Sequence, residues 1–265
     1  MRAGRYCPGA VRIDGAVAIV TGASSGIGAA TCRELASRGA TVVAVARRKE
    51  RLDEVVSSCR DAVAHPADVG ERDACEEVVF STEERFGRVD VLVNNAGISS
   101  HRNAARIPAD EIERVMRVNF FGPVWLTTTA LPGMLERRRG AVVNITSVAA
   151  SIPNPGESHY GASKAALSRW SHGLAVDLHG TGVHVGEVAP GPIDTEIWDL
   201  DEELTYTGRK YPPEVVSAAV ASVIRDDVVK VTVPRQYGAV GALYPLAGRA
   251  LRWGLRRYEE RAPNP

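Results

Sequence analysis

The chain has 265 residues, enough for one large domain with a substantial buried core, and its 32 basic and 32 acidic side chains balance. This balance argues against nucleic acid as a partner for the whole surface. No apolar run approaches about 18 residues, so no transmembrane helix is expected. The cysteines show no C-x-x-C spacing and no histidine cluster accompanies them, so we expect free thiols in the cytoplasm and no metal site.

Strand-like and helix-like segments alternate along the chain. Apolar runs predict strands at 17–20, 41–46, 62–65, 89–93, 140–145, 183–188 and 229–233. Helical patterns fall between them at 29–38, 50–59, 72–86, 109–135, 160–179 and 214–225. The helix at 109–135 should be interrupted near Gly122-Pro123. This alternation predicts an α/β fold of the Rossmann type: a doubly wound parallel β-sheet flanked by helices in a single domain.

No linker, repeat or low-complexity block divides the chain. Residues 1–13 are interpreted as a loose lead-in, whose first nine lack the apolar middle of a signal peptide, and residues 14–234 as the folded domain. Residues 235–265 form a C-terminal extension with apolar residues at helical spacing and several arginines. A basic amphipathic helix can pack on its own domain, on a partner chain or on an anionic membrane surface, and these alternatives stay open.

The turn Thr21–Gly28 joins the first predicted strand to the first predicted helix. Such a turn presents backbone N–H groups at a helix N-terminus, where a diphosphate can bind. Gly22 would permit the sharp turn, Gly26 the approach of backbone to phosphate, and Gly28 close packing of the helix on the strand. The spacing differs from the usual Gly-x-Gly-x-x-Gly fingerprint, so a turn without a ligand is the alternative. The other residues of the expected cofactor-binding turn are Ser24, Ser25 and Ile27.

Two arginines, Arg47 and Arg48, follow the second strand, where many dinucleotide sites carry an acidic residue that holds the ribose diol. Arginine makes bidentate bonds to a 2′-phosphate, which a carboxylate would repel. We therefore expect NADP(H) rather than NAD(H), with Arg47 as the main phosphate ligand and Arg48 and Ser24 assisting. A solvated basic corner is the alternative.

The next two strands also end in candidate cofactor ligands. Asp68-Val69 would reach the adenine edge, although Asp68 is equally suited to cap the following helix. The stretch that follows the fourth strand suits packing against a ribose and hydrogen bonds between neighbouring turns. Its expected cofactor contacts are Asn95, Ala96 and Gly97.

The strongest combination lies at Ser147, Tyr160 and Lys164. Tyr160 and Lys164 are four residues apart on a predicted helix and so share a face, and Ser147 follows the preceding strand. Lowering the pKa of a phenol from ~10 to ~7 takes about 4 kcal/mol, which one ammonium at ~4 Å supplies at an effective dielectric constant of ~20. Tyr160 could then act as an acid/base while Ser147 holds a substrate oxygen. Taken alone, a Tyr–Lys pair at this spacing is more often an ordinary helix-surface contact.

Five motifs in this order resemble the short-chain dehydrogenase/reductase family over roughly Asp14 to Val233; they are Thr21–Gly28, Asn94–Gly97, Ser147, Tyr160-x-x-x-Lys164 and Pro190-Gly191-Pro192. The resemblance implies that Tyr160 is the catalytic acid/base, that Lys164 lowers its pKa and holds the nicotinamide ribose, and that Ser147 orients the substrate. It also implies that Asn119 anchors a water in a proton relay. The segment implied to seat the nicotinamide comprises Pro190, Gly191, Ile193 and Thr195.

The resemblance implies an NADP(H)-dependent oxidoreductase that transfers hydride between the nicotinamide and a carbonyl or secondary alcohol, without a metal. The substrate pocket would be formed by residues 99–102, 148–159 and 196–213, whose apolar side chains favour a fairly apolar small molecule. A homo-oligomer, dimer or tetramer, is implied as well, although the C-terminal extension departs from the family's tetrameric members. The alternative is a non-catalytic NADP(H)-binding regulatory or sensor protein on the same fold.

Overall fold

The computed structural model describes residues 11–100, 102, 105–196, 208–241 and 248. Within them lies one seven-stranded sheet of order β3-β2-β1-β4-β5-β6-β7, in which every neighbouring pair is parallel. Its strands are β1 (Val17–Thr21), β2 (Thr41–Ala46), β3 (Ala62–Pro66), β4 (Val91–Asn94), β5 (Gly140–Ile145), β6 (Val183–Pro190) and β7 (Lys230–Val233). The strand order reverses between β1 and β4, which is the switch point where ligands bind in open parallel sheets.

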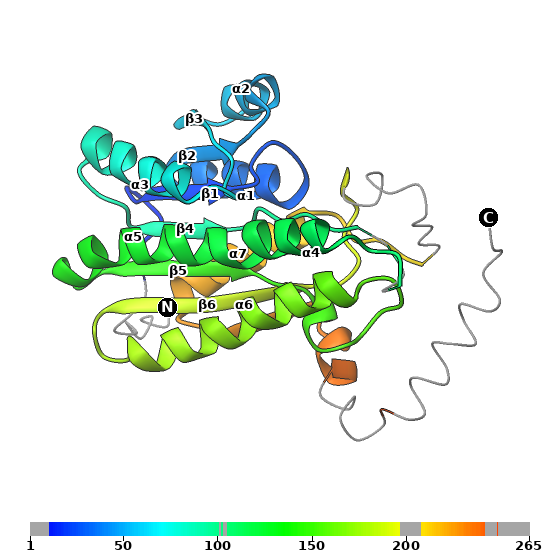
Figure 1. The fold of residues 1–265 in the computed structure, drawn as a ribbon. Helices are drawn as coiled ribbons and strands as arrows, with labels where there is room; N and C mark the ends of the chain where they lie inside the picture. The colour runs from blue at the N-terminus through cyan, green and yellow to red at the C-terminus, as the bar shows by residue number, and fades with distance from the viewer. Residues whose placement is uncertain (1–10, 101, 103–104, 197–207, 242–247, 249–265) are drawn as a thin grey trace.

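Helices cover both faces of the sheet (Figure 1). They are α1 (Gly26–Ser37), α2 (Lys49–Ser57), α3 (Arg72–Phe86), α4 (Ala109–Met116), α5 (Gly122–Glu136), α6 (Ser158–Asp177) and α7 (Glu214–Asp226). Apolar side chains of α1, α2 and α7 form one core with the sheet, and those of α3, α5 and α6 form the other. The predicted doubly wound α/β fold is therefore confirmed.

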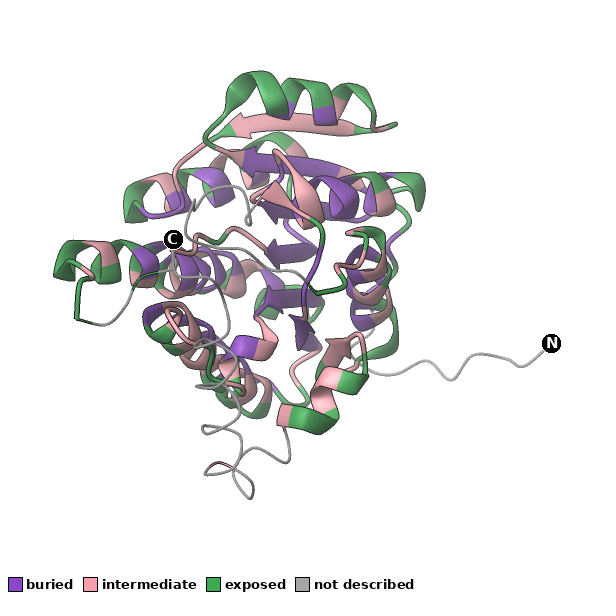
Figure 2. Ribbon diagram, turned by 90° about the vertical axis from the view of Figure 1, so that its right-hand side faces the viewer, coloured by how far each residue is buried: buried purple, intermediate pink, exposed green. Residues whose placement is uncertain are grey.

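The sheet forms the buried centre of the molecule, between the helical layers (Figure 2). Every residue of β1, β4, β5 and β6 is buried, which explains the predominance of apolar side chains in these strands. The expected loose lead-in is in fact packed from Val11 onward. Val11 and Ile13 are buried, and the Val11 N–H donates to the Ile224 carbonyl at 3.2 Å.

The predicted helix at 109–135 deviates at a different point from the one expected. The chain stays helical through Gly122-Pro123, and the irregularity is a π-helical turn, η1 (Arg117–Phe121), that precedes it. The Gly122 N–H donates to the carbonyl of Arg117, five residues earlier. Because Pro123 has no N–H to offer the carbonyl four residues back, a wider turn here loses no regular hydrogen bond. The turn places Asn119 at its centre.

Two sequence predictions fall mostly outside the described residues: the C-terminal amphipathic helix and the loop at 196–213. Residues 236–241 are helical, and residues 208–213 lead into α7. Across the described helices, none is both long and apolar enough to cross a bilayer.

Candidate active site

The glycine turn after β1 is braced by the end of β4. The Thr21 hydroxyl accepts hydrogen bonds from the Asn95 and Ala96 N–H groups, each at 3.0 Å. The Asn95 side chain donates to the Thr21 carbonyl at 2.8 Å and to the Gly22 carbonyl at 3.3 Å. A Cβ on Gly22 would lie 2.8 Å from the Ala96 Cα, and its φ of +65° also favours glycine. The predicted glycine turn, Thr21–Gly28, and the predicted motif after β4, Asn94–Gly97, are therefore joined by hydrogen bonds into one unit.

Helix α1 begins inside the turn, at Gly26, and its N-terminus faces the segment after β6. A Cβ on Gly26 would lie 2.8 Å from the Thr195 Cγ2, and one on Gly28 would collide with the Gly22 carbonyl oxygen. The N-cap, Ser25, makes no side-chain bond to the first turn of the helix. The first turn of α1 therefore presents the backbone donors and the narrow glycine-lined approach that a diphosphate requires.

The two arginines after β2 point in different directions. The Arg48 guanidinium donates to the Ser24 and Ser25 hydroxyls at 3.0 and 3.3 Å. The Arg47 guanidinium instead lies 3.8 Å from the Asp68 carboxylate. Arg48, rather than Arg47, therefore carries the positive charge over the serines of the turn, and the role of Arg47 as the main phosphate ligand stays a prediction.

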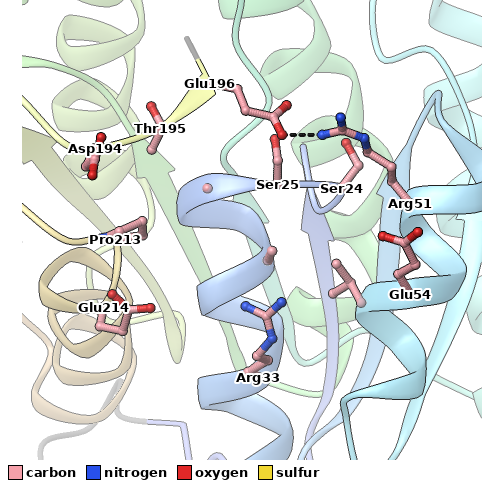
Figure 3. Close-up of a pocket in the computed structure, with 13 residues that line it drawn as sticks. Ser24, Ser25, Arg33, Arg51, Glu54, Asp194, Thr195, Glu196, Pro213 and Glu214 are labelled. Carbon is pink, nitrogen blue, oxygen red and sulfur yellow. Dashed lines mark hydrogen bonds and ion pairs between the residues drawn. The ribbon is translucent and has the colours of Figure 1, made fainter. Parts of the chain in front are cut away.

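A polar cleft of about 710 Å³ opens beside this end of α1 (Figure 3). It is lined by residues of α1, α2 and the segments before and at the start of α7, including Arg33, Arg51, Glu54 and Glu196. The Glu196 carboxylate pairs with Arg51 and lies 3.2 Å from the Arg48 guanidinium. Asn119, Ser147, Tyr160 and Lys164 are not in its lining, whereas Ser24, Ser25, Gly26 and Thr195 are, so the cleft adjoins the glycine turn.

Asp68 and Val69 are both committed to local structure. The Asp68 carboxylate accepts a hydrogen bond from the Gly70 N–H at 2.9 Å, and the N-cap of α3 is Glu71. The capping alternative for Asp68 is therefore wrong. Val69 is buried in the core beneath α3 and α5, so only its backbone could meet a ligand.

The segment after β6 is anchored to the sheet and to the chain before α7. The Gly191 N–H donates to the Val233 carbonyl at 2.7 Å, and Ile193 is buried and bridges to Tyr211. Pro190 is the last residue of β6. These contacts bring Thr195 over the N-terminus of α1, as the Gly26 contact above shows.

Ser147, Tyr160 and Lys164 meet between the end of β5 and the first turns of α6. The Ser147 side chain is near enough to Tyr160 to lower the pKa of its phenol, and the Lys164 ammonium lies 6.0 Å from the centre of the Tyr160 ring. Lys164 is 3 % exposed and donates to the Ile145 carbonyl at 2.9 Å. The structure therefore brings together the three residues that the sequence selected.

The pKa of Tyr160 is shifted in the direction opposite to the one expected. Burial raises it to about 12, and the Ser147 side chain offsets this only partly. Burial also lowers the pKa of Lys164 to about 8. Desolvation opposes the charged form of both side chains and here exceeds the attraction that the sequence argument considered alone.

Asn119 is fully buried and bridges three segments. Its side-chain amide accepts from the Ile98 N–H and donates to the Ile98 carbonyl, both at 2.9 Å, and donates to the Ser163 hydroxyl at 3.0 Å. A Cβ on Gly97 would lie 3.2 Å from the Lys164 ammonium. Asn119 thus joins the end of β4 to the helix that carries Tyr160 and Lys164.

Two features were missed by sequence reasoning. His159 is buried and hydrogen-bonded through Nε2 to the Ser100 hydroxyl at 2.8 Å, a bond that joins the segments 99–102 and 148–159. Glu187 is a fully buried carboxylate in β6. The sequence does show a charged residue within a predicted buried strand, but the partners of Glu187 come from distant segments.

Over the part of the chain that the structure describes, no three His, Cys, Asp or Glu residues form a group that could hold a metal ion. The described cysteines, Cys32, Cys59 and Cys75, are free thiols, and Cys7 lies outside the described residues. Burial raises the pKa of Cys75 to about 12, so its thiol stays protonated.

Together, the glycine turn and the parallel sheet are typical of a dinucleotide-binding protein, and Ser147, Tyr160 and Lys164 gather at the same edge of that sheet. Comparison with known proteins agrees. The family model for short chain dehydrogenases matches residues 16–204. A 3-oxoacyl-[acyl-carrier-protein] reductase of Thermotoga maritima is 36% identical over 234 residues, covering 84% of this chain and 95% of that protein.

Two solved structures are also similar. A 3-ketoacyl-(acyl-carrier-protein) reductase from Brucella melitensis, complexed with NADH, matches with a TM-score of 0.78 and 27% identity over 84% of this chain and 99% of that one. A metagenomic short-chain oxidoreductase in complex with NADP matches with a TM-score of 0.72 and 32% identity over 84% and 98%. The chain belongs to the short-chain dehydrogenase/reductase family and is an NAD(P)-dependent oxidoreductase acting on CH–OH or C=O groups.

Proposed function

We propose that the protein is an NADP(H)-dependent carbonyl reductase in which Tyr160 is the acid/base and Lys164, Ser147 and Asn119 assist it. The observation that carries this proposal is the convergence of three side chains at the end of β5, where the buried Lys164 lies 6.0 Å from the Tyr160 ring and donates to the Ile145 carbonyl, two residues before Ser147. When bound, the nicotinamide would supply the hydride for reduction or accept it for oxidation.

The protein's own residues would manage the proton. The Ser147 hydroxyl would donate to the substrate oxygen while Tyr160, kept protonated by burial, transfers its proton to that oxygen. Lys164, with a pKa of about 8, exchanges protons readily near neutral pH and would resupply the phenol. Asn119 would hold Ser163, and through it the start of α6, in place.

The NADP(H) preference is supported by Arg48 and the two serines that it contacts. These groups form a cationic site with hydroxyl donors beside the N-terminus of α1, the chemistry that a 2′-phosphate requires. The described acidic residue nearest to them, Glu196, is already paired with Arg48 and Arg51. Solved relatives are complexed with NADH in one case and with NADP in another, so the preference rests on these side chains.

Substitution of Tyr160 by Phe tests the proposed chemistry. The variant should lose turnover by at least about a hundredfold while binding NADPH as the wild-type protein does. NADPH binding is measured by fluorescence, and turnover by loss of absorbance with aldehydes, ketones, ketoacyl thioesters, sugars and steroids. Wild-type turnover in the variant would refute the assignment, and tight NADPH binding without turnover of any compound would favour the sensor alternative.

We also propose a fairly apolar small-molecule substrate, a cytoplasmic location and a homo-oligomer. Free thiols at the described cysteines support a reducing compartment. Light scattering after size-exclusion chromatography distinguishes a dimer or tetramer from a monomer. Liposome flotation of the full chain and of a chain ending at Gly238 tests whether the C-terminal extension contacts anionic membranes, and equal behaviour would exclude that contact.

A further inference from the structure

Glu187 is a carboxylate with 0 % exposure in the middle of β6, and the proposed chemistry does not use it. An isolated buried carboxylate costs several kcal/mol, and a well-packed apolar side chain would usually stabilise the fold as well. The presence of this carboxylate in a fully buried strand therefore calls for a reason beyond stability. Its contacts supply one.

Each oxygen of the Glu187 carboxylate meets two polar groups. Oε1 accepts from the Thr146 hydroxyl at 2.7 Å and lies 2.9 Å from the Lys230 ammonium. Oε2 accepts from the Ser168 hydroxyl at 2.8 Å and lies 3.0 Å from the His172 Nε2. Glu187 thus ties the end of β5 to α6 and to the edge strand β7.

Two of these partners belong to the face of α6 that carries the acid/base pair. Tyr160, Lys164, Ser168 and His172 follow one another at intervals of four residues, so they form a single stripe along the helix. The first two are the proposed proton-transfer residues, and the last two contact Glu187. Glu187 therefore contacts the two C-terminal members of the same row of side chains.

The third partner adjoins the serine of the site. Thr146 directly precedes Ser147, and the carbonyl before it, that of Ile145, accepts from the Lys164 ammonium at 2.9 Å. The Thr146 N–H also donates to the Val188 carbonyl at 2.9 Å. Any shift of Thr146 would move the Ser147 hydroxyl relative to Tyr160, and small displacements of reacting groups are costly.

We propose that Glu187 is a positioning residue that holds the end of β5 against the catalytic stripe of α6. Through Thr146 it sets the place of Ser147, and through Ser168 it sets the place of Tyr160 and Lys164. This inference rests on the proposed roles of Ser147, Tyr160 and Lys164. It assigns no contact between Glu187 and the substrate or the cofactor.

Two matched serine variants test the link to α6. Ser168→Ala removes the hydrogen bond to Glu187, and Ser171→Ala removes a similar buried bond of 2.7 Å to Asn144. Both variants remove one buried hydroxyl from the same face of α6, but the Ser171 hydroxyl bonds Asn144 and the Leu167 carbonyl instead of Glu187. Ser168→Ala should lower kcat by about tenfold with NADPH affinity unchanged, whereas Ser171→Ala should change kcat less than about twofold. Equal effects on kcat would overturn the proposal.

Two variants of Thr146 test the link to Ser147. Thr146→Val keeps the shape but loses the hydroxyl, and should lower kcat by about tenfold or more with KM for NADPH unchanged. Thr146→Ser keeps the hydroxyl and should restore kcat to within about threefold of the wild-type value. Glu187→Gln would leave Lys230 and His172 without their carboxylate partner, and that protein could fail to fold. The Thr146 variants keep both of these contacts. Equal kcat in the Val and Ser variants would overturn the proposal.

The Tyr160→Phe protein, assayed in parallel with the same substrate, separates two failures. Full activity in that protein would refute the proposed function itself. An inactive Tyr160→Phe protein beside fully active Thr146→Val and Ser168→Ala proteins would refute only the positioning role. A loss of thermal stability in Thr146→Val and Ser168→Ala without a loss of kcat would likewise assign Glu187 to stability alone.

Discussion

Burial shifts the two titratable side chains of the site away from their charged forms. It raises the pKa of Tyr160 to about 12 and lowers that of Lys164 to about 8. The phenol is thereby kept as a proton donor, and the amine is brought to a pKa at which it both gives and takes protons near neutral pH. A buried ammonium in the free protein also weakens the fold.

Replacing Lys164 by Met should stabilise the folded protein at pH 7 while abolishing turnover. The ordinary lysine pKa is 10.5, and the folded value of about 8 corresponds to about 3 kcal/mol of destabilisation, offset in part by the bond to the Ile145 carbonyl. The penalty is complete below pH 8. As the pH rises from 8 to 10.5 the unfolded state binds more protons, so wild-type stability increases.

Urea unfolding of both proteins at several pH values measures this effect. We expect Lys164→Met to be more stable by on the order of 2 kcal/mol at pH 7, with the advantage declining toward pH 10.5. An advantage that stayed constant across this range would show that packing, rather than ionisation, causes it.

Removal of Arg48 should weaken NADPH binding more than removal of Arg47. Arg48→Gln loses the guanidinium over Ser24 and Ser25, whereas Arg47→Gln loses one that faces Asp68. Charge-assisted bonds are worth about 1.5–3 kcal/mol, so the NADPH dissociation constant should rise about tenfold or more in Arg48→Gln, with NADH binding nearly unchanged. A larger effect at Arg47 would restore the assignment made from the sequence.

Among the elements, the π-helical turn η1 contributes both to the core and to the candidate site, through Val118 and Asn119 respectively. It carries Asn119 into contact with Ile98 and Ser163, and it joins α4 to α5 directly. The following residue, Gly122, packs so closely on the Val69 carbonyl that a Cβ there would collide with it. The turn is therefore held in place by contact with the loop before α3.

Substitutions of two helical glycines should have effects of opposite sign. Gly122→Ala should destabilise the protein by on the order of 1–3 kcal/mol, because a backbone carbonyl must move. Gly173→Ala, in α6, should stabilise it by about 0.5–1 kcal/mol, because a Cβ there meets nothing within 4 Å and alanine favours the helix. Thermal unfolding compares the two variants with the wild type, and a neutral Gly122→Ala would show that the loop yields easily.

Local sequence patterns were enough to predict most helices and strands and to select the candidate catalytic residues. The strand Thr41–Ala46, the helix Arg72–Phe86 and the strand Gly140–Ile145 have the predicted bounds. The sequence could not show which of two adjacent arginines faces the serines, because the path of the chain into α2 decides it. Nor could it show the partners of Glu187, because they come from β5, α6 and β7.

At the scale of the whole molecule, the parallel sheet brings the ends of β1, β4, β5 and β6 to one edge. Residues that are more than a hundred positions apart in the chain therefore build one site, from Thr21 to Thr195. A cofactor bound there would contact several strands at once. Its binding free energy would then stabilise the entire domain.

Addition of NADPH should raise the unfolding temperature of the wild-type protein. At a concentration of 100 times the dissociation constant the stabilisation is about 2.7 kcal/mol, which corresponds to roughly 5–10 °C for a chain of this size. NADH at the same concentration should give a clearly smaller shift. Equal shifts in differential scanning fluorimetry would contradict the proposed preference for NADP(H).

The bonds between the glycine turn and the end of β4 limit how this cofactor site can be rebuilt by recombination. Thr21 and Asn95 are mutual supports, since each holds the backbone of the other's segment. In a chimera that takes only residues 16–30 from a relative, the transferred loop would have to bond to residues 91–97 of this chain instead of to the matching segment of that relative. Exchange of residues 16–30 together with 91–97 transfers the whole module, and crossover points for family shuffling belong outside both segments.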